Sequence, residues 1–341
     1  MEGRGSHLSP FLPSLHLSPP TMQLDRVRRL TSRLDSSVNW LIPFLDKRPG
    51  MVETRFVQKK PEYFISYVSS SIGCNQGCKQ CFLTQNGQTA MHSIDVSEYL
   101  QQLRFSLDHY RAKPPVEKQA TRININFMAR GEPFLNRHVL FKFADLYHAL
   151  DSACAAEGLK MKLNLSTIMP GTMRFRTLEE VLPHHSIVPQ TYLYYSLYST
   201  NETFRKLWMP NAMPWQAALE KLKVYQANTN PNVITFHWPF IAGQNDKQKD
   251  IDELADAFRT YRFKAKLNVV RYNNHPNLPH QETPLQRIRE IYEQLNEALG
   301  DPTGSYIVPR VGQDISASCG MFEGDRGDFE GGFENPPTPP N

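Results

Sequence analysis

Apolar side chains recur along the chain with two alternating periods, which predict a regular succession of strands and helices. Six segments have the composition of strands, at 63–69, 121–128, 160–167, 191–198, 232–239 and 264–270. The second of them shows the two-residue period most clearly, with Ile123, Ile125 and Phe127 on one face. Between the strands, apolar residues recur with helical spacing over four segments, 96–107, 141–156, 215–225 and 251–258.

The last predicted helix is marked at both ends. Thr283 is its expected N-cap, Pro284 lies in its first turn and Gly300 follows its last turn. Six strand–helix units in series predict an α/β protein with an open parallel (βα)6 partial barrel. Sites in such barrels lie at the carboxyl ends of the strands, so candidate chemistry is expected there.

The chain outside this alternation divides into further segments. Residues 1–21 are rich in Ser, Pro, Leu and His, and the tail 323–341 is acidic and rich in Gly and Pro, so both are predicted to be disordered. Met22 is an alternative start of the chain. Residues 22–60 are predicted to form an N-terminal helical extension, with a helix over 24–34, and 61–322 to form the core domain. That helix would carry four basic residues, Arg26, Arg28, Arg29 and Arg33.

Composition narrows the class of protein. The five cysteines are odd in number and clustered, which argues against a secreted disulfide framework and favours a reducing compartment, the cytoplasm. No apolar stretch approaches the roughly 20 residues of a membrane span, so no membrane association is expected. The net charge is +4, but five acids and one arginine follow Gly320, which leaves +8 on the rest of the chain. That balance suits a polyanionic partner.

Cys74, Cys78 and Cys81 follow the first predicted strand with C-x3-C-x2-C spacing. A [4Fe–4S] cluster needs a ligand on each iron, so three cysteines leave one iron for a small molecule. In radical enzymes that molecule is S-adenosylmethionine (SAM). The alternatives are a zinc site without its fourth ligand and three unrelated thiols. With five cysteines in 341 residues, chance is a poor explanation of this spacing.

Polar residues end several later strands. Gly131-Glu132-Pro133 offers a carboxylate that can accept a hydrogen bond from the SAM ammonium. Further polar groups stand at Ser166-Thr167, Ser196-Leu197-Tyr198 and Asn273. Each alone is equally well an ordinary strand terminus. Their convergence on one barrel mouth, beside the cysteine loop, favours a binding site.

These blocks resemble, in order and spacing, the RlmN/Cfr radical SAM methyltransferases, which methylate an adenine carbon of RNA. The resemblance extends from about residue 51 to about residue 322. Val52-Glu53-Thr54 is similar to a Val-Glu-Thr whose glutamate lies beside the target base, and 128–136 is similar to Met-Gly-x-Gly-Glu-Pro-x-x-Asn. Residues 310–320 resemble Arg-x-x-x-Gly-x-Asp-Ile-x-Ala-Ala-Cys-Gly, which ends in a methyl-carrying cysteine, here Cys319.

The resemblance implies a function and its residues. Cys319 would accept a methyl group, an adenosyl radical would activate it, and the carbon would add to adenine C2 or, less readily, C8, with Glu53 removing the ring proton. The cofactors would be a [4Fe–4S] cluster on the three cysteines and SAM. The SAM-binding residues would be Gly131, Glu132, Ser166, Ser196, Leu197, Tyr198 and Asn273. The partners would be ribosomal or transfer RNA and a one-electron donor such as flavodoxin or ferredoxin, with the enzyme a monomer.

The departures from the family pattern keep alternatives open. The family resolves its covalent intermediate with a second cysteine seven residues before the first cluster ligand, where this chain has Tyr67. Tyr198 replaces a histidine, and Cys154 lies in a helical run as a buried hydrophobe. One alternative is therefore a radical SAM enzyme of different chemistry or substrate on the same scaffold. A metal-stapled RNA-binding module is the weakest, since it needs no polar groups at the strand ends.

Overall fold

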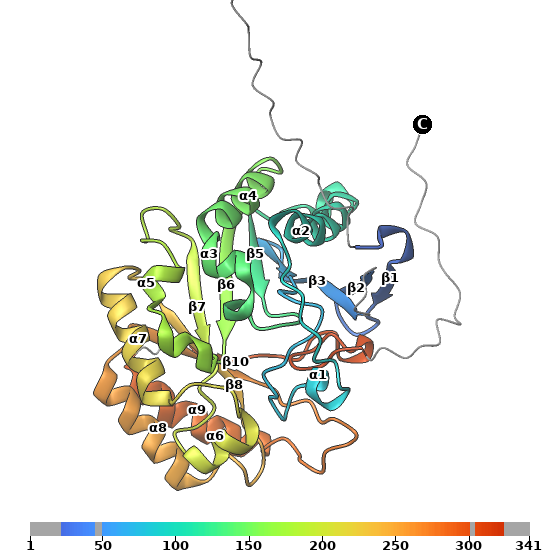
Figure 1. Ribbon diagram of the computed structural model, residues 1–341. Coiled ribbons are helices and arrows are strands. Elements are labelled where there is room, and N and C mark those ends of the chain that lie inside the picture. Colours follow the sequence, from blue (N-terminus) through green and yellow to red (C-terminus); the bar gives the residue numbers. More distant parts are fainter. Residues whose placement is uncertain (1–21, 45–49, 301–303, 324–341) are drawn as a thin grey trace, which may run out of the picture.

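The computed structural model describes residues 22–44, 50–300 and 304–323, and these form one ten-stranded sheet whose strands neighbour one another in chain order (Figure 1). The first four strands are antiparallel neighbours, and every later pair is parallel. The strands are β1 (Arg28–Thr31), β2 (Val38–Phe44), β3 (Gly50–Lys60), β4 (Tyr63–Tyr67), β5 (Arg122–Phe127), β6 (Lys160–Thr167), β7 (Thr191–Tyr195), β8 (Ile234–Pro239), β9 (Ala265–Val270) and β10 (Tyr306–Ile307).

Helices follow the parallel strands and cover the outer side of the curved sheet (Figure 1). They are α1 (Phe82–Gln85), α2 (Val96–Arg111), α3 (Arg137–Phe141), α4 (Phe143–Ala155), α5 (Leu178–Val181), α6 (Glu202–Trp208), α7 (Trp215–Asn228), α8 (Gln248–Tyr261) and α9 (Leu285–Leu299). Short 3-10 helices lie at Leu24–Arg26, Pro115–Glu117, Pro133–Leu135, Gly171–Phe175 and Gln313–Ile315. No helix in these residues is long and apolar enough to cross a membrane.

The predicted α/β class with a parallel sheet is confirmed, because each of the six predicted strands overlaps one of β4 to β9. The predicted N-cap of the last helix, Thr283, was wrong. The N-cap of α9 is Pro284, and the Thr283 hydroxyl instead donates a hydrogen bond to Asp246 Oδ2 at 2.9 Å. The predicted disordered segment 1–21 and, from residue 324, the tail lie outside the described residues.

The helical extension predicted over 22–60 was wrong. Its described residues form the short 3-10 helix Leu24–Arg26 and then β1, β2 and β3, which continue the sheet beyond β4. Val27, Leu30 and Leu34 have helical spacing, but the chain around Trp40 and Ile42 offers β1 a strand partner and buries its own apolar side chains. Tertiary pairing therefore overrides the local pattern. Charged side chains on an edge strand discourage further pairing, which suits Arg28 and Arg29 on β1.

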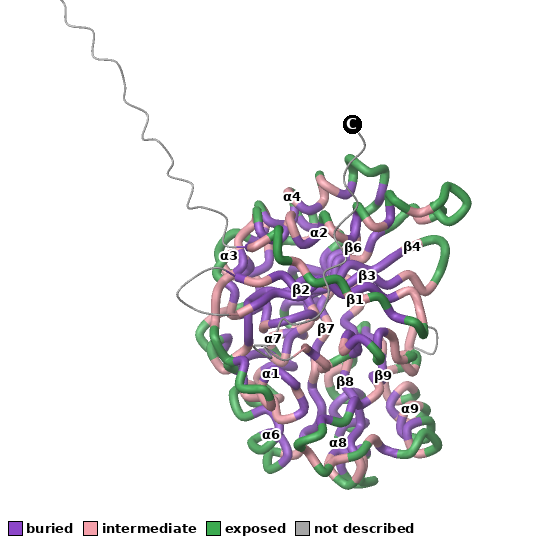
Figure 2. The backbone as a smooth tube through the Cα atoms, turned by 90° about the vertical axis from the view of Figure 1, so that its right-hand side faces the viewer, coloured by how far each residue is buried: buried purple, intermediate pink, exposed green. Residues whose placement is uncertain are grey.

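The two faces of the parallel strands differ in polarity. Ile123 and Ile125 on β5 and Leu163 on β6 have no exposed surface and belong to the main hydrophobic core. Figure 2 shows the strands mostly in the purple of buried residues, with the exposed residues in green mainly on the surrounding helices and loops. The alternate residues, such as Asn124 and Asn164, line a cavity inside the barrel. Barrel interiors of this type are commonly filled by Val, Ile and Leu. Packing of the core does not explain the polar side chains in this barrel interior, so they indicate a binding site.

Candidate functional site

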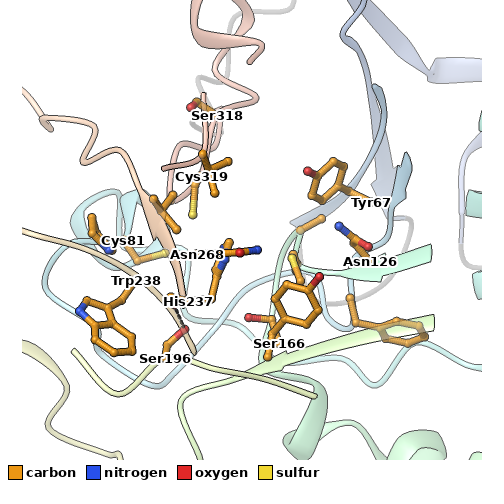
Figure 3. A pocket seen from close by; sticks show the side chains of 18 of the residues that line it. Tyr67, Cys81, Asn126, Ser166, Ser196, His237, Trp238, Asn268, Ser318 and Cys319 are labelled. Atoms are coloured by element: carbon orange, nitrogen blue, oxygen red, sulfur yellow. Dashed lines mark hydrogen bonds between the residues drawn. The ribbon is translucent and has the colours of Figure 1, made fainter. Parts of the chain in front are cut away.

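One cavity of about 260 Å³ occupies the barrel interior and its mouth at the carboxyl ends of the strands (Figure 3). It brings together residues from the cysteine loop, from the strands β3 to β10 and from the C-terminal segment. The predicted site residues that line it are Cys74, Cys78, Cys81, Gly131, Glu132, Ser166, Ser196, Tyr198 and Cys319. The other three predicted residues, Glu53, Leu197 and Asn273, do not line it.

The cysteine loop wraps closely against the chain that follows it. A Cβ at Gly73 would lie 2.5 Å from the carbonyl oxygen of Gln88, so only glycine fits there. Cys74, Cys78 and Cys81 are half-buried free thiols, and burial raises the pKa of Cys74 to about 12. These thiols therefore need a cationic ligand to ionise.

This donor set fits a [4Fe–4S] cluster, in which each cysteine binds a different iron and one iron stays open. The three thiolates of such a cluster bind three separate irons, whereas a zinc site gathers its thiolates on one ion. In the part of the chain that the structure describes, no three His, Cys, Asp or Glu side chains are grouped as a single metal ion requires. The zinc alternative considered above has no fourth ligand in the loop.

Glu132 places a buried carboxylate beside the cysteine loop. Its Oε1 accepts a hydrogen bond from Phe134 N and its Oε2 one from Ile168 N, both at 3.1 Å. Burial raises its pKa to about 7, although these hydrogen bonds act in the opposite direction. The preceding Gly131 has φ +92°, and a Cβ there would lie 2.7 Å from Ser71 N. The carboxylate can therefore receive an ammonium group, which would stabilise its charged form.

The remaining residues predicted to bind SAM divide into two groups. Ser166 and Ser196 face the cavity, and Ser196 Oγ donates to the His237 carbonyl at 2.8 Å. Tyr198 also faces it, from a left-handed backbone conformation with φ +64°. Leu197 is buried in the core, whereas Asn273 binds the C-terminal segment, donating from Nδ2 to the Cys319 carbonyl at 2.8 Å.

The segment 310–323, which we call the Cys319 loop, crosses the barrel mouth. Phe82, next to the third cysteine, donates its backbone N–H to the Gly320 carbonyl at 3.0 Å. Phe322 packs against Phe82 in a small apolar cluster. Asp314 accepts from the Ser32 hydroxyl at 2.7 Å and ties the loop to the N-terminal strands. Cys319 thus lies over the cavity as an exposed free thiol, and the surrounding protein raises its pKa.

The structure does not bring Glu53 to the cavity. Its carboxylate has no exposed surface and accepts hydrogen bonds from Arg55 Nη2 at 2.7 Å, Arg130 Nη2 at 2.7 Å and Asn39 Nδ2 at 3.1 Å. Burial alone would raise the pKa of Glu53, but the two arginines outweigh it and lower the pKa. In this arrangement Glu53 is an anchor for two arginines and is not placed to accept a ring proton.

Arg55 and Arg130 are the residues that the sequence reasoning missed. Arg55 donates to the carbonyl oxygens of Ala317 at 3.0 Å and Met321 at 2.8 Å, and Arg130 donates to that of Glu323 at 2.7 Å. Their guanidinium groups lie 4.9 and 5.8 Å from the centre of the Phe322 ring. We call Glu53, Arg55 and Arg130 the arginine clamp. The sequence held one signal for these two residues. Arg55 directly follows the motif Val52-Glu53-Thr54, and Arg130 lies within the motif at 128–136.

Comparison with known proteins agrees with the motifs, although no protein-family model matches the chain. The dual-specificity RNA methyltransferase RlmN of Ruegeria pomeroyi is 27% identical over 268 residues, 75% of this chain and 63% of that protein. A probable RlmN of Koribacter versatilis is 29% identical, over 75% of this chain and 68% of its own. This chain is a relative of the RlmN proteins. The match spans about two thirds of their length.

One solved structure gives the same fold. A radical SAM methyltransferase from Sphaerobacter thermophilus superposes with a TM-score of 0.71 over 88% of this chain and 81% of its own, at 22% identity. The parallel partial barrel is therefore the fold of that protein.

A further sequence relative covers more of the chain. An RlmN of Francisella tularensis matches at 26% identity over 295 residues, 85% of this chain. The resemblance inferred from the motifs is confirmed.

Tyr67 is the departure from the RlmN pattern that bears most directly on chemistry. It lies on the wall of the cavity opposite Cys319 (Figure 3). Burial raises its pKa, and Cys319 is close enough to raise it further. Its phenol therefore remains protonated near pH 7 and offers no nucleophile comparable with a thiolate.

Proposed function

We propose that this chain is a radical SAM methyltransferase that adds a methyl group to a ring carbon of adenine, C2 or less readily C8, in ribosomal or transfer RNA. The position of Cys319 over a cavity lined by the three cysteines is the observation that carries this proposal. The similarity to RlmN proteins supports it independently.

The residues at the barrel mouth would have different roles in binding the cofactors. Cys74, Cys78 and Cys81 would hold the cluster, and Glu132 would receive the ammonium group of SAM at the open iron. When bound, these cofactors supply a methyl group and, after one-electron reduction, an adenosyl radical. The electron would come from a donor such as flavodoxin or ferredoxin in the cytoplasm. The enzyme would act as a monomer.

Cys319 would carry the transferred carbon. Its sulfur exchanges a proton for a methyl group, and that group then loses one hydrogen atom to the radical. The remaining methylene would bond to the ring carbon and form a covalent protein–RNA adduct, and the ring would lose one proton and one electron, which the bound cofactors would accept. Release as a methyl group would then require a thiol that takes the Cys319 sulfur into a disulfide, with a proton added to the freed carbon. The clamp holds the backbone on both sides of Cys319, at Ala317 and Met321, so the sulfur is kept over the cavity.

RNA would approach at the barrel mouth, where a base taken out of its stack can reach the cavity. Arg28 and Arg29 on the edge strand and the nearby Arg26 and Arg33 are candidates for phosphate contacts. Such contacts make affinity fall with salt.

The proposal is tested by nucleoside mass spectrometry. Anaerobically reconstituted protein is incubated with SAM, a reductant and total RNA from cells lacking the protein, and Cys319→Ala and Cys154→Ala are treated in parallel. Methyladenosine should form with wild type and Cys154→Ala only. Cys154 is a matched control because it is buried in α4, outside the cavity.

A second candidate function rests on Tyr67. A radical SAM enzyme acting on another substrate would not need the resolving thiol that Tyr67 replaces. It predicts SAM cleavage without methylated RNA in the same experiment.

A further inference from the structure

Two rows of polar side chains face each other inside the barrel, below the cysteine loop. One row is Tyr67, Asn126 and Asn164, which are register neighbours on β4, β5 and β6. The other is His237, Asn268 and Tyr306, which are register neighbours on β8, β9 and β10. All six residues line the same cavity, and Figure 3 shows Tyr67 and Asn126 across it from His237 and Asn268. We call these the polar rows.

The hydrogen bonds of the polar rows are incomplete. Asn164 Nδ2 donates to Asn126 Oδ1 at 2.6 Å. The Oδ1 atoms of Asn164 and Asn268 and Nδ1 of His237 are buried without a partner among the described residues. Asn164 and Asn268 are only 1% and 2% exposed. Buried polar atoms are normally paired, so unmet groups around one cavity point to something that binds there.

The polar rows are electrically neutral near pH 7. Burial, reinforced by the nearby charges of Lys59 and Lys266, lowers the pKa of His237 to about 4. Burial raises the pKa of Tyr67, so its hydroxyl keeps its proton. Tyr194 adds an aromatic ring, edge-on to His237 with 5.5 Å between ring centres. Neutral amides, a neutral imidazole and aromatic rings complement a planar heterocycle with several donors and acceptors.

We propose that the polar rows are the subsite that receives the target base, an adenine extruded from its stack and hydrogen-bonded by Asn126, Asn164, Asn268 and His237. This inference rests on the proposed function and assigns the residues that select the base. Asparagine side chains pair well with the amino group and ring nitrogen of adenine. Tyr67, at the end of one row, also lies opposite Cys319, so a base held there lies beside the carrier sulfur.

The test uses adenosine 5′-monophosphate as the probe, bound to the anaerobic holoprotein and followed by calorimetry. Asn164→Leu and Asn268→Leu remove the amides at similar volume, and Asn296→Leu is the matched control. Asn296 also has a buried Oδ1 without a partner, but it lies on α9, outside the cavity. Each row variant should weaken binding by about tenfold, the size expected for loss of a base contact, and Asn296→Leu should leave it unchanged.

A second arm separates the target base from the adenine of SAM. With S-adenosylhomocysteine at saturation, adenosine 5′-monophosphate should still bind, and the row variants should still weaken it. Full competition would assign the polar rows to SAM and overturn the proposal. Unchanged affinity in both row variants would also overturn it, since the unmet groups would then be satisfied by water alone.

One further measurement covers the case in which the variants cannot be compared. If the leucine variants do not fold, photocrosslinking of wild type with 8-azidoadenosine 5′-monophosphate replaces them. Labelled peptides should then come from β5, β6, β8 or β9, and labelling confined to other peptides would contradict the proposal. Failure of the proposed function would appear separately, as binding of the probe without methylated RNA.

Discussion

Arg130 and Glu53 form a fully buried ion pair, with 2.9 Å between Nε and Oε1 and 2.7 Å between Nη2 and the same oxygen. Neither side chain has exposed surface. The same guanidinium donates to the Glu323 carbonyl, so a charge buried in the barrel wall reaches the Cys319 loop. The loop is therefore held by ionic and hydrogen-bonding contacts in addition to its apolar packing on Phe82.

Arg130→Met should destabilise the protein strongly, because it leaves the Glu53 carboxylate buried with one fewer partner. Removing one member of a buried pair costs about 3–5 kcal/mol. Chemical denaturation measures the loss, and hydrogen exchange of the 317–323 peptide should increase. The double variant Glu53→Gln/Arg130→Met should recover part of the stability. Simple addition of the two single losses would contradict a direct pairing.

The cluster ligands are tested by iron content and SAM cleavage. The anaerobic protein should bind about four irons, as a [4Fe–4S] cluster requires. Cys78→Ala should abolish reductive SAM cleavage, because the cluster and its open iron are lost together. Cys154→Ala is the matched control and should keep both. Full SAM cleavage by Cys78→Ala would remove the cysteine loop from the mechanism.

His237 should make stability depend on pH. Its pKa is lowered to about 4 in the folded protein from an ordinary 6.5. Between these values the unfolded chain binds the extra proton, so stability is complete above pH 6.5 and is lost as the pH falls toward 4. From pH 7.5 to 5 the loss should be about 2 kcal/mol. Urea unfolding of wild type and His237→Gln measures it as a difference between the two proteins. Parallel pH curves would contradict a buried neutral imidazole.

Tyr67 should limit turnover. In the proposed mechanism, release of the RNA requires cleavage of the bond between the Cys319 sulfur and the transferred carbon, and a phenol does not replace a thiolate in that attack. Wild type should accumulate a covalent protein–RNA adduct, visible on denaturing gels. Tyr67→Cys should reduce the adduct, whereas the control Tyr67→Phe should not. Fast, adduct-free turnover by wild type would show that another group resolves the intermediate.

Much of the fold was predictable because its signals are local. The two-residue period of residues such as Ile123 and Ile125 and the capping of helices like α2, by Asp95 and Glu98, are encoded within a few positions. The fold of residues 22–60 was not predictable from local signals, since Val27 and Leu30 fit a helix as well as a strand. Only the pairing of β1 with β2 decides between them.

The candidate site also has parts that local sequence signals predict and parts that they do not. The cysteine loop and Gly131-Glu132 are compact motifs, and the structure places both in the cavity. The clamp depends on contacts between Arg55 or Arg130 and a loop nearly two hundred residues or more away, which spacing in the sequence cannot reveal. Glu53 was assigned to proton transfer from the resemblance of Val52-Glu53-Thr54 to the family motif. Arg55 is only two positions away, but its ion pair with Glu53, like that of Arg130, forms only in the folded chain.

Peptide mass spectrometry of Cys319 tests the central claim most directly. Protein produced with SAM available and active in RNA methylation is digested and its cysteine peptides are compared. The account predicts one added methyl group on Cys319 and none on Cys154, with loss of RNA product in Cys319→Ala. Active protein whose Cys319 is never methylated would contradict the account.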